Sequence, residues 1–512
     1  MARSRKKPIR KSKARIRRVA TARAPVVAAV DLGSNSFHLV IAQIRDGAPF
    51  VVDRAREMLR FGSALDHHGK IRPESAKAAL LCLRRFGQHL ALWRPQLVRA
   101  VGTNTLRVAA QSDDFLARAE ERLGAPISVI SGVEEARLIY RGVSPGLAGN
   151  ERVLLIDVGG GSTEIVVGEG SVPQVMESVT LGSVTLTDEV FTGHLLSETR
   201  FAQAVKKARA RLMTVHGAVM AAGWTRVMGS SGTVRAVESM VRDSGLAERG
   251  LRRAHVEEVI RRLIAQRRID RLVMPGLATE RAPVIMGGLA VLMAVFDVFG
   301  VDTMEVSRGA LREGILYDLI DQMQGQDVRS AAVTGLAERW PTPMGEDVAH
   351  GVTQFAGSVA AAWSLTDEDR RFLEWGARLH GCGEAIAHTR FHLHSAYIVR
   401  SAELAGFSRH QQDFLGALIE LHRGRWSGSN LRSLKGLYGG SIIRLAALLR
   451  LAVATERMRA AYGHLTVHLN AQGARLRIHV TMRSGIQRAA ALADLAEECA
   501  QMAKSGIRFA LD

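Results

Sequence analysis

Short apolar runs separated by turns rich in Gly and Ser dominate the first half of the chain. The runs Val26–Val30 and Phe37–Ile44 flank the segment Asp31–Ser36, and residues 153–167 repeat this arrangement around Asp157–Thr163. Apolar runs bounded by Gly, Ser and Asn predict strands joined by tight turns. The pattern of a strand ending in Asp, a small-residue turn and a second strand occurs twice, 126 residues apart. We therefore predict a duplicated α/β lobe whose two turns face each other across a cleft.

The pattern changes to helical periodicity at about residue 324. Asp367–His380 and Gln411–His422 are predicted helices, and few strand signals lie between them. Near the C-terminus, apolar and polar residues alternate on both sides of Gly473, which predicts a hairpin. A period of two places Arg475, Arg477 and His479 on one face of that hairpin.

These patterns divide the 512 residues into several units, as expected for a chain too long for one core. Pro341 and Pro343 interrupt the chain near the start of the helical region, and residues 423–430 are typical of a linker. The predicted fold class is α/β lobes followed by an all-α domain and a small mixed α/β domain. The predicted domains are a basic tail (1–24), lobe I (25–138), lobe II (139–323), a helical domain (324–425) and a basic C-terminal α/β domain (426–512).

The composition of the chain bears on the cellular compartment in which the protein works. Apolar residues make up 47% and charged residues 23% of the chain, which is typical of a globular protein. The three cysteines are far apart and odd in number, which favours a reducing compartment over a disulfide framework. The longest apolar run, Val284–Phe296, is shorter than the roughly 20 residues that a membrane span needs. We predict a cytoplasmic protein that contacts membranes peripherally at most.

The net charge of +19 is concentrated at the two ends. Residues 1–24 carry +11 and residues 431–512 carry +7, which leaves +1 for the remainder. Clustered cations favour a polyanionic partner, because binding releases the counterions of the polymer. The tail is therefore a candidate for binding nucleic acid or another polyanion, and the alternative is a solvated arm without a partner.

The two Gly-rich turns carry the candidate chemistry. They can present several backbone N–H groups to an anion, and an Asp at a strand end can hold Mg²⁺ beside a phosphate. The alternative is that both are ordinary hairpin turns with capping aspartates. Between the lobes, Glu134 and Glu135 precede a helical run, where they are either first-turn residues favoured by the helix dipole or a source of a general base. Arg107 could neutralise phosphate charge, and Met228–Thr233 is another small-residue loop.

Together these residues resemble the exopolyphosphatase and guanosine pentaphosphate phosphohydrolase family, which belongs to the sugar kinase, Hsp70 and actin superfamily. The resemblance runs in family order through six segments: 29–39, 101–107, 130–137, 156–164, 228–233 and 307–314. It implies actin-like lobes, an HD-like helical domain, the long four-domain form of the family and a homodimer.

The resemblance also implies roles for individual residues. Glu135 would be the general base, Glu164 would position metal or water, and Asp157 together with Glu164 would hold Mg²⁺. The implied phosphate-binding residues are Ser34, Asn35, Ser36, Arg107, Gly159, Gly160, Gly161, Ser162 and Thr163. Water would attack the terminal phosphoryl group in line, without a covalent intermediate. Arg475 and Arg477 are candidates for holding a polymeric substrate.

Two departures from the family pattern stand out. Pro283 follows Arg281-Ala282 where the family more often has Asp, and Gly381 follows His380 where an HD domain would have its Asp. A metal site of the HD type is therefore not expected. A different site could draw on His350, His380, Cys382, His388, His392, His394 and His422.

The sequence favours an exopolyphosphatase that releases orthophosphate from inorganic polyphosphate, because of where the charge lies. The nearest alternative is a guanosine pentaphosphate 5′-phosphatase using the same residues. A kinase or ATPase on the same fold and a non-enzymatic polyanion-binding scaffold are the remaining alternatives.

Overall fold

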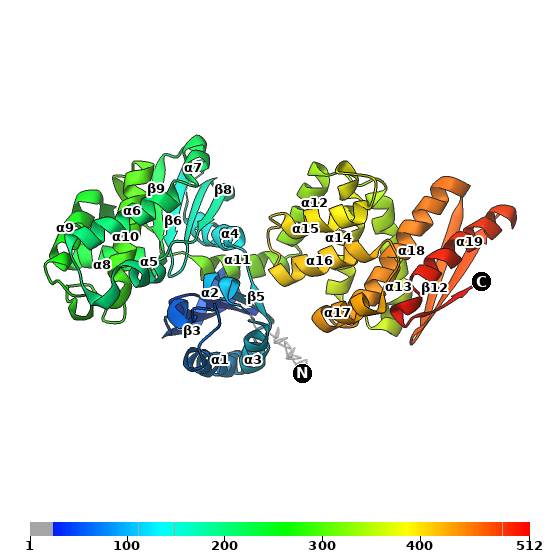
Figure 1. Cartoon of the computed structure of the whole chain (residues 1–512), viewed down its shortest axis with the longest axis horizontal. Helices are drawn as coiled ribbons and strands as arrows, with labels where there is room; N and C mark the ends of the chain where they lie inside the picture. The colour runs from blue at the N-terminus through cyan, green and yellow to red at the C-terminus, as the bar shows by residue number, and fades with distance from the viewer. Residues whose placement is uncertain (1–23, 111, 148, 484) are drawn as a thin grey trace, which may run out of the picture.

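The computed structural model describes residues 24–110, 112–147, 149–483 and 485–512. The basic tail predicted for residues 1–24 lies almost entirely outside these residues. Figure 1 shows an elongated arrangement, with the two lobes at one end, the helical region beside them and the C-terminal strands at the far end.

Lobe I is built on a five-stranded sheet of order β3-β2-β1-β4-β5. Alternating apolar residues bury both faces of its central strand, and α1 and α3 cover one face of the sheet. The elements are β1 (Val26–Leu32), β2 (Ser36–Arg45), β3 (Ala48–Met58), α1 (Pro73–Trp93), β4 (Leu97–Gly102), α2 (Asn104–Val108), α3 (Asp113–Leu123), β5 (Ile127–Val129) and α4 (Gly132–Val143).

Lobe II repeats this topology in a six-stranded sheet of order β10-β11-β9-β6-β7-β8. In each lobe an antiparallel hairpin precedes a strand that pairs in parallel with the first strand of the hairpin. The elements are β6 (Arg152–Val158), β7 (Thr163–Glu169), β8 (Val172–Val179), α5 (Ser183–Val190), α6 (Glu198–Leu212), α7 (His216–Ala222), β9 (Arg226–Ser230), α8 (Ser231–Asp243), β10 (Leu251–Arg252), α9 (Arg253–Ile264), α10 (Ala282–Phe299), β11 (Thr303–Val306) and α11 (Leu311–Met323). The predicted duplication of an α/β lobe is confirmed.

Helices α4 and α11 cross between the lobes. α4 packs on strands β7 and β8 of lobe II, whereas α11 packs on strands β1 to β4 of lobe I. They approach closely because glycines lie at the crossing: a Cβ on Gly314 would lie 1.8 Å from the carbonyl oxygen of Leu138, and one on Gly142 would lie 2.1 Å from that of Ala310. The predicted boundary at residues 138/139 thus falls inside α4, since the lobes exchange helices and share one apolar cluster.

α10 is the most apolar helix of lobe II. It has 18 residues and a mean hydropathy of 2.1, so by length and composition it could cross a membrane, yet 83% of it is buried inside the protein. The helix extends beyond the 13-residue run seen in the sequence, because Pro283 fits its first turn. In the described part of the chain, α17 and α18 pass the same test only as a pair bent by 119°.

The remaining residues form a helical region and a small sheet. The helices are α12 (Val328–Arg339), α13 (Gly345–Trp363), α14 (Asp367–Leu379), α15 (Phe391–Ser401), α16 (Arg409–Leu421), α17 (Gly428–Tyr438), α18 (Ser441–Tyr462) and α19 (Gly485–Gln501), and the strands are β12 (Leu465–Gln472), β13 (Arg475–Met482) and β14 (Arg508–Leu511). The predicted helices at 367–380 and 411–422 and the hairpin at Gly473 are confirmed.

The predicted division at residues 425/426 differs from the structure. One apolar cluster runs from Val333 to Met502, so the helical region and the C-terminal sheet share a core. Trp426, in the predicted linker, is buried, and α18 packs against α13, α14 and α16. A long apolar helix needs burial on several sides, and here both units supply it.

Candidate active site

The two Gly-rich turns meet at one cleft, as predicted. A Cβ on Gly160 would lie 3.0 Å from the Cβ of Ser34, and one on Gly161 would lie 3.0 Å from the Ser34 hydroxyl oxygen. A Cβ on Gly161 would also lie 2.4 Å from Asn104 Oδ1, so this close approach favours glycine in the β6–β7 turn. The Thr105 hydroxyl donates to Ser34 Oγ over 2.9 Å and fixes the opposite turn.

The cleft has a volume of about 480 Å³ and lies between the lobes. The predicted residues that line it are Ser34, Asn35, Ser36, Glu135, Asp157, Gly159, Gly160, Gly161 and Ser162. The loop Met228–Thr233 also contributes, because its Ser231, Gly232 and Thr233 begin α8 at the wall of the cleft. The sequence thus predicted most of the turn residues that line the cleft.

Arg107, Glu164 and Thr163 lie behind this lining. Arg107 Nη1 donates to Glu135 Oε2 over 3.1 Å, so it contacts the candidate base. Glu164 is buried and accepts a hydrogen bond of 2.9 Å from Ser178. The Thr163 hydroxyl donates to the Leu181 carbonyl oxygen, and its side chain is therefore not available to bind phosphate in the cleft, contrary to expectation.

Four carboxylates gather on one side of the site. Glu135, Asp157 and Glu164 are buried, and Asp31 is half-buried with its Oδ1 buried. Burial raises the pKa of Asp31 and of Glu135 to about 7, against the partial opposition of Arg312 and Arg107 respectively. Burial also raises the pKa of Asp157, and burial with the charges of Glu135 and Asp157 raises that of Glu164. The group carries more negative charge than its neighbours neutralise.

A hard divalent cation would neutralise this excess negative charge. Asp31 Oδ1 is buried without a hydrogen-bond partner, and carboxylate oxygens suit Mg²⁺. Among the described residues, no three such side chains are already gathered closely enough to hold a metal by themselves. Because Mg²⁺ usually takes one or two carboxylates and completes its shell with water and substrate phosphates, the residues present fit this ion.

Arginines form a second wall of the cleft. Arg54, Arg56, Arg235, Arg281 and Arg312 line it, and within the described residues none of them forms an ion pair with an acidic side chain. Burial and the charges of Arg56 and Arg235 lower the pKa of Arg281 to about 10. Burial next to Arg312 lowers the pKa of His38 to about 2, so His38 is neutral and accepts from Arg312 at Nδ1. These cations face an open space, where an anionic ligand would neutralise them.

Sequence reasoning did not identify this wall. The arginines come from β3, α8, α11 and the residue before α10, and no local motif joins them. Arg281 and Arg312 lie in segments that the sequence singled out for other reasons. The two hairpins do share one register that could have been read from their sequences. Asp31 pairs with His38 in lobe I, and Asp157 pairs with Glu164 at the equivalent positions of lobe II.

Other candidates lie away from the cleft. Arg475 and Arg477 are exposed residues of β13, and neither forms an ion pair in the described chain. The C-terminal sheet lies at the end of the molecule away from the lobes (Figure 1). In the helical region, His380 and His422 are buried with ring centroids 5.2 Å apart, and each uses Nδ1 to donate to a backbone carbonyl. The described residues contain no set of three His, Cys, Asp or Glu side chains placed to bind a metal there.

Comparison with known proteins agrees with this geometry. A model described as the Ppx/GppA phosphatase family matches residues 40–323, and a model of domain III of that family matches residues 328–498. A guanosine-5′-triphosphate,3′-diphosphate pyrophosphatase of Aeromonas hydrophila is 35% identical over 432 residues, covering 84% of this chain and 87% of the relative. One from Vibrio campbellii is 32% identical over 459 residues, covering 89% and 92%.

Solved structures resemble the lobes. A Cytophaga hutchinsonii exopolyphosphatase superposes with a TM-score of 0.54 at 24% identity, and an Aquifex aeolicus Ppx/GppA family member with 0.51 at 23%. Each match covers 58% of this chain and 98% of the other, and at this identity it speaks for the fold alone. With two family models that together span most of the sequence and relatives aligned over nearly their whole length, this chain belongs to the Ppx/GppA phosphatase family.

Proposed function

We propose that the protein is a Mg²⁺-dependent phosphoanhydride hydrolase that removes the terminal 5′-phosphate of guanosine pentaphosphate. The observation that carries this proposal is that four largely buried carboxylates and five arginines, which form no ion pair among the described residues, gather at one cleft. A ligand with phosphates at both ends would have its scissile group at the carboxylates and its remaining phosphates at the arginines. The names of the relatives favour the same substrate.

Each group has a chemical role in this proposal. Asp157 and Glu164 would hold Mg²⁺, with Asp31 close by, and the ion would neutralise charge on the phosphoryl oxygens. Backbone N–H groups of Gly159–Ser162 and of the Ser34–Ser36 turn would orient the phosphate. Glu135 would accept a proton from the attacking water, since a base whose pKa lies near neutrality is suited to that step. Arg107, 3.1 Å from Glu135, would orient its carboxylate.

Exopolyphosphatase activity is the second candidate. It uses the same cleft, and the exposed Arg475 and Arg477 would contact a chain long enough to reach both ends of the molecule. The positive charge of the C-terminal region supports this substrate less than its net value suggests. Arg450 and Arg457 form ion pairs with Glu498, and Arg459 forms one with Glu456.

A direct comparison decides between them. Phosphate release from guanosine pentaphosphate and from polyphosphates of defined length should be measured side by side with Mg²⁺ and with chelator. We expect the higher kcat/KM on the nucleotide, and no turnover of either with chelator. A higher kcat/KM on long polyphosphate would favour the second candidate, and ATP-dependent phosphoryl transfer to an acceptor would contradict both.

A further inference from the structure

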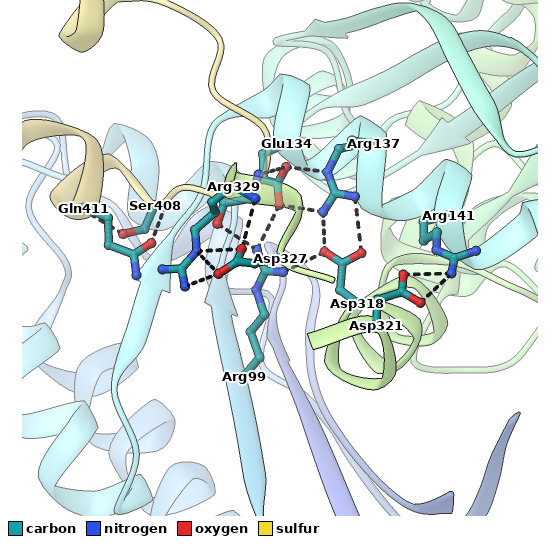
Figure 2. A network of polar contacts seen from close by, with 11 residues as sticks. Arg99, Glu134, Arg137, Arg141, Asp318, Asp321, Asp327, Arg329, Ser408 and Gln411 are labelled. Carbon is teal, nitrogen blue, oxygen red and sulfur yellow. Dashed lines mark hydrogen bonds and ion pairs between the residues drawn. The ribbon is translucent and has the colours of Figure 1, made fainter. Parts of the chain in front are cut away.

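A second group of buried charges lies where the lobes meet the helical region, and we call it the junction network. It consists of Arg99, Glu134, Arg137 and Asp318, and Figure 2 shows it together with Asp327 and Arg329 of the helical side. A cavity of about 750 Å³ lies beside it. The catalytic proposal uses none of these residues, although Glu134 is the neighbour of Glu135.

Glu134 is the centre of the network. Its carboxylate accepts from Arg137 Nε over 2.7 Å, from Arg137 Nη2 over 3.0 Å, from Arg99 Nη2 over 2.8 Å and from the Gly406 backbone N–H over 2.9 Å. Only 1% of its side chain is exposed. Both carboxylate oxygens are therefore fully used, and the start of α4 is held from several directions.

Asp318 of α11 closes the network from the other side. It accepts from Arg99 Nη1 over 2.8 Å and forms an ion pair with Arg137. β4, α4 and α11 are thus joined through side chains that lie almost wholly out of water. The next ion pair along the same helices, Arg141 with Asp321, is partly exposed, and in the described structure neither side chain forms an ion pair with the helical region.

The helical region contacts two residues next to Glu135, namely Glu134 and Arg107. The loop between α15 and α16 supplies the Gly406 N–H to Glu134, and Arg409 at the start of α16 donates to the Arg107 carbonyl oxygen over 3.4 Å. Gly406 has a φ of +84°, and a Cβ there would lie 2.5 Å from Val328 Cγ1 and 2.8 Å from Arg329 Cγ. Arg329 in turn is clamped by Asp327 and Glu368. The loop is fixed on both sides.

We propose that Glu134 is a positioning residue through which the helical region holds Glu135 in the geometry that catalysis needs. Glu134 and Glu135 share the first turn of α4, so a displacement of one moves the other relative to Arg107 and the attacking water. A shift of about 1 Å at a reacting group can lower a rate about a hundredfold. This inference rests on the proposed role of Glu135 as the base.

The test compares two variants with two matched controls in the full-length protein. Glu134→Gln removes the charge at the centre of the network, and Gly406→Ala displaces the loop without changing the lobes. Asp321→Asn alters the neighbouring ion pair, and Gly439→Ala places alanine at a φ of +79° where nothing lies within 4 Å. kcat and KM for guanosine pentaphosphate are measured at a temperature at which melting curves show every variant fully folded.

We expect kcat to fall about ten- to hundredfold in Glu134→Gln and in Gly406→Ala, with KM and both controls within about threefold of the parent. Unchanged kcat in the two variants would overturn the inference, and so would a rise in KM alone. Activity lost only in proportion to unfolding, or failure of both variants to fold, would show a purely structural role. Glu135→Gln is measured alongside: if it keeps full kcat, the proposed base is wrong, whereas an inactive Glu135→Gln with an active Glu134→Gln contradicts this inference alone.

Discussion

Glu134 and Glu135 are adjacent, both buried and on the same turn of α4, yet their surroundings have opposite effects on their pKa values. Burial raises the pKa of both, but for Glu134 the charges of Arg137 and Arg99 and the Gly406 N–H outweigh burial and bring its pKa below the ordinary value. Glu135 has Arg107 as its cationic neighbour and Asp157 nearby, and its pKa rises to about 7. The first carboxylate is neutralised within the protein, whereas the second remains able to exchange a proton.

The same contrast separates the junction network from the cleft. In the junction network, acidic and basic side chains are matched and form a framework. In the cleft, the carboxylates raise one another's pKa and the arginines lower one another's, and Arg312 and Arg107 offset only part of the rise at Asp31 and Glu135. Unmatched buried charge is costly in a free protein, so its presence indicates a place where ligands complete the electrostatics.

The largest expected effect is on catalysis at Glu135. Glu135→Gln should lower kcat about 10²- to 10⁴-fold, because a positioned base contributes a factor of that order. Steady-state phosphate release from guanosine pentaphosphate measures it, with Glu169→Gln as a surface control on β7. An unchanged kcat would remove Glu135 from the mechanism.

The free energy of unfolding should depend more on Glu134 than on Glu135. Glu134→Gln should lower the free energy of unfolding by about 3 kcal/mol, because it leaves Arg99 and Arg137, which are largely buried, with Asp318 as their one remaining carboxylate in the network. Glu135→Gln should leave it unchanged or slightly higher, because ionising Glu135 is already unfavourable in the fold. Denaturant unfolding of both variants measures the difference, and equal losses would erase the distinction drawn between the two glutamates.

Arg281 tests the cationic wall. Arg281→Gln should raise KM for guanosine pentaphosphate about ten- to hundredfold, since a hydrogen bond to a charged group is worth about 1.5–3 kcal/mol. Arg268→Gln is the control, because Arg268 lies in the same lobe and is paired with Asp270 at the surface. A KM equal to that of the parent would show that the substrate does not reach this wall.

The excess of carboxylates predicts how stability depends on pH and Mg²⁺. Asp31 and Glu135 have pKa values of about 7 in the fold, above their ordinary 3.8 and 4.5. Between about pH 4 and 7 the folded state therefore holds more protons than the unfolded state, and the unfolding free energy of the metal-free protein should fall as pH rises. Mg²⁺ should raise the melting temperature more at pH 8 than at pH 5.5, and Asp31→Asn should flatten both responses. A metal-free melting temperature that rises over this range would contradict the account.

The smallest effect is expected at the C-terminal sheet. Arg475→Gln with Arg477→Gln should raise KM for long polyphosphate a few-fold at low salt and leave guanosine pentaphosphate hydrolysis unaltered, since distant charges add to binding only for a chain that reaches them. Removing residues 324–512 is a poor substitute for this test, because the truncation would also remove Gly406 from Glu134. Equal KM values for parent and double variant at low salt would exclude this surface from polymer binding.

The sequence by itself determined the local parts of the site. A few consecutive residues encode each strand, its terminal Asp and the Gly-rich turn that follows. The turns at Ser34–Ser36 and Gly159–Ser162, and their duplication, were therefore predictable from periodicity and turn chemistry alone. The C-terminal hairpin was predictable for the same reason, since alternation fixes which residues face solvent.

Only the tertiary structure decided how distant charges pair. Glu134 contacts two arginines that also bind Asp318, and a backbone N–H 272 residues away. The cleft arginines form no ion pair within the described residues. The sequence of the Glu134-Glu135 pair does not distinguish these two kinds of surroundings. The boundaries at 138/139 and 425/426 depended on it as well, because helices packed across the predicted divisions. Local patterns reflect short-range conformational preference, but the protonation and role of a buried charge depend on which distant groups packing brings within a few ångströms.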